Sequence, residues 1–241
     1  MAHCYWLDGL AGLAVGDVAT LSGEEAHHAA VVSRMRRGER VLLSDGAGTL
    51  AEGVIDLAER DRVDVVVHAL EAVPEPSPRI ALAQALAKGD RAELAVQAAT
   101  ELGVDAIVPW QARRSVVQWK GERGEKALER WRRVVREAGK QAIRPRLPQV
   151  LPLVRTADLA QLARDWRIVV LDPTASDSIA GLPLDRDLLL VVGPEGGIDP
   201  GELELLEAAG AVRVRLGAEV LRTSTAGLAA ISALSLRLGR W

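Results

Sequence analysis

The sequence predicts a two-domain α/β protein, in which a small β-barrel precedes a larger domain with a mostly parallel sheet. Three patterns carry this prediction. Residues 1–72 hold short alternating apolar segments, residues 73–79 are rich in proline, and residues 80–241 alternate apolar strands with amphipathic helices. A chain of 241 residues is long enough to form two such cores.

The first part is predicted to be all-β. Its strand patterns are short runs bounded by turn residues, at Val41–Leu43, Leu50–Ile55 and Val63–Leu70. Residues 73–79 contain three prolines, which cannot donate to a sheet ladder and favour an extended, stiff conformation. The domain boundary is therefore expected in residues 73–79.

Residues 80–241 show strand and helix patterns in turn, which is typical of a parallel sheet with helices on both faces. Strands are expected at Ile80–Ala87, Asp105–Pro109, Arg167–Leu171, Asp187–Val192 and Val212–Leu216. Helices are expected at Asp90–Leu102, Glu122–Gly139, Pro200–Ala209 and Thr225–Leu238. Asp90 and Glu93 have the spacing of a capping box, and Thr223 to Thr225 are expected to cap the last helix.

Composition excludes several classes of protein. Hydrophobic residues make up 49%, but no apolar run reaches the roughly 18 residues of a membrane span. The N-terminus lacks the pattern of a signal peptide. Cys4 is the single cysteine, so no internal disulfide can form, and four scattered histidines give no zinc-binding spacing. We therefore expect a cytoplasmic protein without a metal.

The net charge of −3 hides two basic regions. Residues 113–146 contain twelve lysines and arginines against four glutamates, and Arg34, Arg36, Arg37 and Arg40 form a second group. Arginine matches phosphate oxygens in a bidentate manner, which favours a polyanion on this face. The alternative is a solvated helix on which Glu122 and Glu129 form ion pairs with neighbouring basic residues.

Glycine-containing loops follow the last predicted strands. Gly193–Gly197 follows Leu188–Val192, and Gly217 follows the strand that ends at Leu216. Leu171–Pro173 ends a third strand. Ligands of parallel sheets bind beyond the carboxyl ends of strands, so these loops predict one shared pocket. Neither the dinucleotide fingerprint nor the P-loop motif occurs, and each loop by itself could be a tight turn.

Taken in order, these residues resemble the ribosomal RNA small subunit methyltransferase E family of the SPOUT superfamily. The resemblance covers nearly the whole chain. In the first domain it is carried by His28, Val32, Arg34, Met35, Gly38 and Leu43–Gly46. In the second it is carried by Lys88, Thr100–Val104, Arg114–Val117, Glu137, Ala138, Gln141, Arg144, Pro148, Gly193–Gly197, Leu216, Gly217 and Leu221–Thr223.

The resemblance implies a PUA-like barrel over residues 1–72 and a SPOUT methyltransferase domain over residues 80–241. The last segment of that domain would thread a trefoil knot, and two copies would form a homodimer. S-adenosylmethionine would be the methyl donor, and the product would be a uridine methylated at N3 in 16S ribosomal RNA. The expected partner is that RNA within the 30S subunit or a late precursor.

The resemblance also implies site residues. The donor would lie among Leu171, Asp172, Pro173, Gly193, Pro194, Glu195, Gly196, Gly197, Leu216, Gly217, Val220, Leu221, Thr223 and Thr225. From the chemistry of the reaction, and not from the resemblance, Arg222 beside the cofactor loop is the first catalytic candidate, as a cation that stabilises a uridine anion. Glu195 is a second candidate, as a general base or as an acceptor of backbone N–H bonds. The basic clusters motivate the expected RNA contacts of Arg34, Arg36, Arg114, Lys140 and Arg144, and His28 and Gln141 are expected to join them.

Three positions depart from the family pattern, namely Ser224, Ala98 and Ala142, so any role of the usual side chains there cannot be transferred. Two other functions stay open. One is an RNA-binding protein that has lost catalysis, which the intact glycine loops disfavour. The other is a knotted methyltransferase that acts on transfer RNA.

Overall fold

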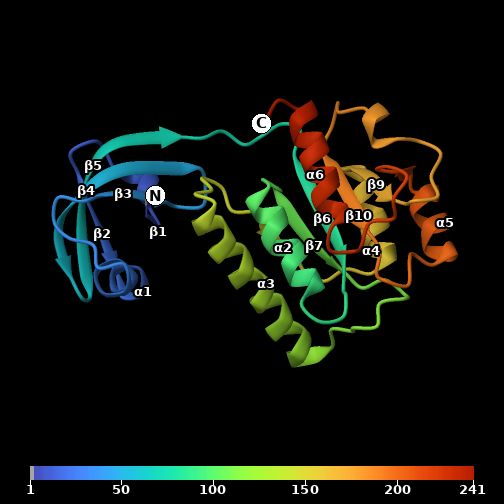
Figure 1. The fold of residues 1–241 in the computed structure, drawn as a ribbon, viewed down its shortest axis with the longest axis horizontal. Helices are drawn as coiled ribbons and strands as arrows, with labels where there is room; N and C mark the ends of the chain where they lie inside the picture. The colour runs from blue at the N-terminus through green and yellow to red at the C-terminus, as the bar shows by residue number, and fades with distance from the viewer. Residues whose placement is uncertain (1–2) are drawn as a thin grey trace. The chain divides into compact units, whose positions relative to one another are not determined.

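The computed structural model describes residues 3–241, and the chain forms two compact units (Figure 1). The first unit contains the residues up to Glu75 and, in addition, Gly139–Leu147. The second contains Pro76–Ala138 and Pro148–Trp241. The sequence predicts one boundary between the domains, at residues 73–79. It does not predict that residues 139–147 belong to the first unit.

The first unit is built on a five-stranded sheet in the order β1-β3-β4-β5-β2. The strands are β1 (Cys4–Trp6), β2 (Val18–Ser22), β3 (Arg40–Ser44), β4 (Thr49–Glu59) and β5 (Arg62–Ala72). β1 pairs with β3 in parallel, and the other pairs are antiparallel. The all-β expectation was incomplete, because η1 (Leu10–Gly12), α1 (Gly23–His27) and the π-helical turn η2 (His28–Val32) are helical. Ala26 and Ala29 bury the inner face of α1 and η2 in the core.

Backbone hydrogen bonds attach the 139–147 segment to the first unit. The amide of Gly48 donates to the carbonyl of Pro145 at 2.9 Å, and the amide of Leu147 donates to Gly46 at the same distance. Arg146 Nε donates to the carbonyl of Val73 at 3.0 Å. These bonds join residues that lie far apart in the sequence, 73 positions in the case of Arg146 and Val73, and local sequence patterns do not encode them.

The second unit has a six-stranded sheet in the order β11-β9-β10-β6-β7-β8, and all recorded pairs are parallel. Its strands are β6 (Ile80–Ala85), β7 (Ala106–Trp110), β8 (Gln149–Val150), β9 (Arg167–Leu171), β10 (Leu188–Val192) and β11 (Val212–Val214). Its helices are α2 (Arg91–Glu101), α3 (Gly121–Gln141), α4 (Thr156–Gln161), α5 (Pro200–Ala208) and α6 (Ala226–Arg237), with short turns η3 (Leu162–Arg164) and η4 (Ile179–Gly181). The last three residues of α3 belong to the first unit.

The central strands β6, β7 and β10 are buried on both faces, whereas the edge strands β8 and β11 are partly exposed. Ala81, Ala83 and Ala85 belong to a core cluster that also holds residues of α4 and α5. Alternate residues of a strand point to opposite faces, so Leu82 faces the other side, where it lies close to Gly227 of α6. Figure 1 shows α2 and α6 side by side, and both contact β6. The predicted parallel sheet with helices on both faces is confirmed.

The predicted helix caps do not form. Asp90 makes no side-chain capping bond, and Glu93 instead accepts from Arg130 Nη2 at 2.5 Å. Thr225 is the N-cap residue of α6, but its hydroxyl donates to the carbonyl of Arg222 at 3.2 Å. Thr223 is turned away from α6 altogether. Distant partners take up Glu93 and Thr223, whereas Thr225 makes a local bond to Arg222 in place of a cap.

Replacing Gly227 by alanine should lower the free energy of unfolding by about 1 kcal/mol, with overpacking outweighing the gain in helix propensity. The added Cβ would lie 2.8 Å from Leu82 Cδ1, inside the core. Urea denaturation measures the change. Gly181→Ala is the control, because no heavy atom lies within 4 Å of a Cβ there. An unchanged or raised midpoint for Gly227→Ala would contradict this packing.

Candidate functional site

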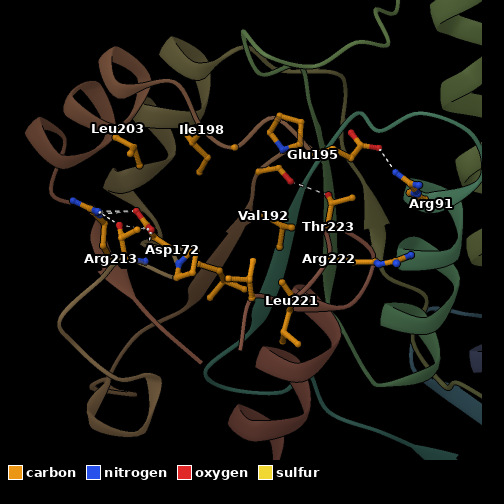
Figure 2. Close-up of a pocket in the computed structure, with 18 residues that line it drawn as sticks. Arg91, Asp172, Val192, Glu195, Ile198, Leu203, Arg213, Leu221, Arg222 and Thr223 are labelled. Atoms are coloured by element: carbon orange, nitrogen blue, oxygen red, sulfur yellow. Dashed lines mark hydrogen bonds and ion pairs between the residues drawn. The ribbon is translucent and has the colours of Figure 1, made fainter. Parts of the chain in front are cut away.

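A cavity of about 600 Å³ lies in the second unit, beyond the carboxyl ends of β9 and β10 (Figure 2). Three segments far apart in the sequence enclose it, because the parallel strands end at the same edge of the sheet. They are the loop after β9, the loop after β10 and the segment between β11 and α6. The lining residues are Arg91, Leu171, Asp172, Pro173, Thr174, Val192, Gly193, Pro194, Glu195, Gly197, Ile198, Leu203, Arg213, Val220, Leu221, Arg222, Thr223 and Ala226.

Two glycines shape the loop after β10. A Cβ on Gly193 would lie 2.7 Å from Ile198 Cγ1, so a larger residue does not fit there. Gly197 has φ of +72°, which favours glycine, and its amide closes a turn on the carbonyl of Pro194 at 2.9 Å. The loop therefore keeps its backbone close to the cavity.

Thr223 ties two of the cavity segments together. Its side chain is buried, and its hydroxyl donates to the carbonyl of Gly193 at 2.8 Å. Figure 2 shows this bond crossing from the segment before α6 to the end of β10. This hydrogen bond therefore fixes the position of the segment before α6 relative to the loop after β10.

Glu195 binds the start of α2. Its carboxylate accepts from the amide of Lys88 at 3.2 Å and from Arg91 Nη1 at 3.0 Å. Burial raises the pKa of Glu195, but hydrogen bonds from backbone amides and from Arg91 outweigh burial and leave that pKa below its ordinary 4.5. A carboxylate with a lowered pKa is a weak base. The geometry therefore favours the alternative reading of Glu195 as an acceptor that holds the loop.

Asp172 uses both carboxylate oxygens within the protein. One oxygen accepts from Arg213 Nη2 at 2.7 Å and Nε at 3.0 Å, and the other accepts from the amide and hydroxyl of Thr174. Burial raises the pKa of Asp172, while the bonds from Thr174 and Arg213 lower it further than burial raises it. The group is an ionised anchor of the loop after β9.

Arg222 lies at the edge of the cavity with its side chain exposed. Its carbonyl accepts from the amides of Thr225 and Ala226, which fixes the backbone at the start of α6. No hydrogen bond or ion pair of its guanidinium is recorded within residues 3–241. In Figure 2 the side chain extends on the same side of the cavity as Arg91. Unlike Arg91, it keeps an uncompensated charge.

Four of the expected cofactor residues lie elsewhere. Leu216 and Gly217 line a smaller neighbouring cavity of about 50 Å³, which shares Val220 and Leu221 with the larger one. Gly196 and Thr225 are not among the residues recorded as lining either cavity. The carbonyl of Gly196 accepts from Arg114 Nη1 at 3.2 Å, so Gly196 faces that arginine instead.

Several residues that line the cavity were not predicted from the sequence. Arg91 and Arg213 line the cavity, where they form ion pairs with Glu195 and Asp172. Val192, Ile198 and Leu203 supply apolar wall. Val192 could have been predicted, because it ends a predicted strand next to the glycine loop. The two arginines lie in a helix and a strand, where no local sequence pattern indicates a binding site.

Two of the expected RNA contacts are occupied within the first unit. Lys140 Nζ binds Glu25 Oε2 at 2.7 Å and lies 5.2 Å from the ring centre of Tyr5, with only 12% of its side chain exposed. The ring of His28 packs edge-on against Tyr5 at 5.9 Å. Both side chains therefore already have partners within this unit, and their contact with RNA stays a prediction.

The other expected RNA contacts are more accessible. Arg34, Arg36 and Gln141 are exposed, and Arg144 is partly buried. Arg114 is about half exposed beside the glycine loop. On α3, ion pairs neutralise part of the basic surface, namely Lys126–Glu122, Arg132–Glu129 and Arg130–Glu93. This helix therefore fits the alternative of a solvated, ion-paired face.

Within residues 3–241, no helix is long and apolar enough to cross a membrane, and no group of three or more potential ligands is arranged for a metal ion.

The fold and the cavity define an RNA methyltransferase, as comparison with known families shows. Residues 74–235 match the model of an RNA methyltransferase domain, and residues 21–67 match that of an RNA methyltransferase PUA domain. Ribosomal RNA small subunit methyltransferase E of Mycobacterium tuberculosis is 44% identical over 94% of this chain and 89% of its own length. The Bacillus subtilis enzyme of that name is 33% identical over 90% and 89%. The chain belongs to the ribosomal RNA small subunit methyltransferase E family.

Solved structures agree with this assignment. The Neisseria gonorrhoeae ribosomal RNA small subunit methyltransferase E, bound to S-adenosylmethionine, superposes with a TM-score of 0.88 at 28% identity. A Legionella pneumophila methyltransferase, also bound to this cofactor, superposes with a TM-score of 0.87 at 30% identity. Each comparison covers 98% of both chains.

The ion pair at the cavity should make stability depend on pH. Because the folded-state pKa of Asp172 lies below its ordinary 3.8, the stabilisation is complete above that value and is lost as pH falls through the folded pKa. Asp172→Asn should therefore cost about 1.5–3 kcal/mol near neutral pH and progressively less in acid. Urea denaturation across pH measures this.

The matched control is Asp165→Asn, an exposed aspartate with no side-chain partner recorded among the described residues. It should change stability little at any pH. An Asp172→Asn deficit that stays constant down to strong acid would contradict the ionised pair.

Proposed function

We propose that this protein transfers a methyl group from S-adenosylmethionine to N3 of a uridine in 16S ribosomal RNA of the small subunit. The observation that carries the proposal is the meeting of three strand-end segments at one cavity, in a chain that belongs to this methyltransferase family. The names of its relatives support a small-subunit RNA substrate, and with such a substrate the enzyme would act in the cytoplasm.

The cavity fits the proposed cofactor. An adenosyl group needs apolar walls for its ring and backbone polar groups for its edges. Val192, Ile198 and Leu221 supply apolar lining, and the backbone of Gly193 and Gly197 lies open to the same space. Glu195 and Asp172 would support their loops through Arg91 and Arg213. The bound cofactor would supply an electrophilic methyl group on a sulfonium centre.

The role of the chain is mainly to position the substrate and stabilise charge. Uracil N3 must lose its proton to become a good nucleophile, so negative charge develops on the ring. Arg222 is the proposed catalytic residue, because its guanidinium lies at the cavity edge with no recorded partner among the described residues. A cation there would stabilise the anion as donors stabilise an oxyanion. We assign no general base.

Arg34, Arg36, Arg114, Gln141 and Arg144 stay the proposed RNA contacts, supported by the PUA domain match and by the accessible charge of these arginines.

A homodimer is proposed as well. Support comes from large apolar side chains of the second unit that are exposed in the single chain, including Leu94 at 56% and Leu236 at 63% on the contacting helices α2 and α6. Membership of the family supports the predicted trefoil knot of the carboxy-terminal segment.

The decisive test is nucleoside mass mapping of RNA from a strain that lacks this gene. Fragments of 16S RNA should lose one N3-methyluridine, and expression of the wild-type chain should restore it. Transfer RNA from the same cells is the internal control and should keep all its methylated nucleosides. Loss of a methyl group from transfer RNA with intact 16S RNA would reject this substrate in favour of the transfer RNA alternative.

Replacing Arg222 by alanine should lower the turnover number by roughly 100-fold or more, because a charge-stabilising group is lost from the transition state. Affinity for the cofactor should be kept. Single-turnover methylation assays and calorimetric titration measure the two quantities separately.

Arg215→Ala is the matched control, since Arg215 is an exposed arginine of the same region that lines neither cavity. It should methylate at a near-normal rate. An Arg222→Ala enzyme as fast as this control would remove Arg222 from the mechanism.

A further inference from the structure

One polar side chain lies inside an otherwise apolar strand beneath the site. Strand β6 (Ile80–Ala85) is buried along its whole length, and Gln84 is its one polar residue, with none of its surface exposed. Burial of an amide costs free energy unless hydrogen bonds compensate. Gln84 does not line the cavity, so direct contact with a ligand does not explain it.

The contacts of Gln84 point to Thr223. Its Nε2 donates to Thr223 Oγ1 at 3.0 Å and to the carbonyl of Ala85 at 3.3 Å. Its Oε1 is buried and has no hydrogen-bond partner within residues 3–241. The Nε2 group of Gln84 thus donates to the segment that lines the cavity, while its Oε1 acceptor is left unsatisfied. A buried unsatisfied acceptor lowers the stability of the fold, so stability alone does not explain this arrangement.

The bond from Gln84 decides where the Thr223 hydroxyl points. A hydroxyl has one proton and two lone pairs. Since an N–H of Gln84 occupies a lone pair of Thr223 Oγ1, the proton remains free for the carbonyl of Gly193, which lies 2.8 Å away. The reversed orientation of the amide would compete with Gly193 for that same proton. The two bonds therefore form a directed chain from β6 through Thr223 to the end of β10.

The segment that precedes Thr223, Leu216–Leu221, has few other hydrogen bonds to the rest of the chain. No backbone–backbone hydrogen bond is recorded for Leu216–Leu221 among the described residues, and Val220 is 76% exposed. The buried hydroxyl of Thr223 is thus the main polar link between this segment and the glycine loop.

We propose that Gln84 is a positioning residue for cofactor binding, acting through the Thr223 hydroxyl to hold the Leu221–Thr225 and Gly193–Gly197 segments in register. The inference rests on the proposed function, since it assigns Gln84 a role in binding S-adenosylmethionine. It predicts that Gln84 and Thr223 act as one unit.

A double-mutant cycle tests this coupling. Gln84→Met removes the donor while nearly keeping volume, and Thr223→Val removes the hydroxyl while keeping shape. Each should weaken binding of S-adenosylmethionine, measured by isothermal titration with the full chain, by about 10-fold. In the Thr223→Val background, Gln84→Met should add less than about 2-fold. Thr223→Ser, which restores a hydroxyl, should recover much of the affinity lost in Thr223→Val.

Controls separate positioning from a general loss of stability. Thr100→Val removes another buried hydroxyl, which donates to the carbonyl of Val96 within α2, and Thr100 does not line the cavity. It should leave cofactor affinity unchanged even if it lowers the midpoint of unfolding. Each variant is compared at a temperature at which denaturation curves show it fully folded.

The outcomes are distinct. Additive losses for Gln84→Met and Thr223→Val, or an unaffected affinity in either variant, would overturn the inference while leaving cofactor binding intact. A wild-type chain that gives no binding heat would instead reject the proposed function, together with every role derived from it.

Discussion

The parallel pairing of β9, β10 and β6 is the constraint on which the site depends. Leu190 of β10 lies opposite Val169 of β9 on one side and Leu82 of β6 on the other. Because the three strands run in the same direction, the segments that follow them emerge at one edge of the sheet. Helix α6 packs closely on this sheet, with Gly227 against Leu82. The segment between β11 and α6 therefore also lies at this edge.

Charge around the cavity is largely balanced within the protein. Glu195 pairs with Arg91, Asp172 with Arg213, and Asp199 with Arg113. Each acid anchors a loop, so its burial is offset by hydrogen bonds and by an opposite charge. Arg222 stands outside the paired set, which is why it is the cation best suited to interact with a substrate.

Much of the second unit could be predicted from its sequence. The bounds of β9 were predicted at the residues observed, and those of β10 differed by one position, since long apolar runs in a buried parallel sheet leave little ambiguity. The short helix α4 and the helical stretch from Gly23 to Val32 were missed, because each is too brief for a periodic pattern. The capping box at Asp90 failed since Arg130, distant in sequence, attracts Glu93.

The sequence by itself determined the α/β class, the family and the three segments that line the cavity, because apolar runs and glycines act over a few residues. Only the tertiary structure decided which polar groups bind one another. Gln84 and Thr223 are 139 positions apart, and Lys140 meets Glu25 across 115. A hydrogen bond depends on distances of about 3 Å, which the packing of whole elements fixes and local pattern does not encode.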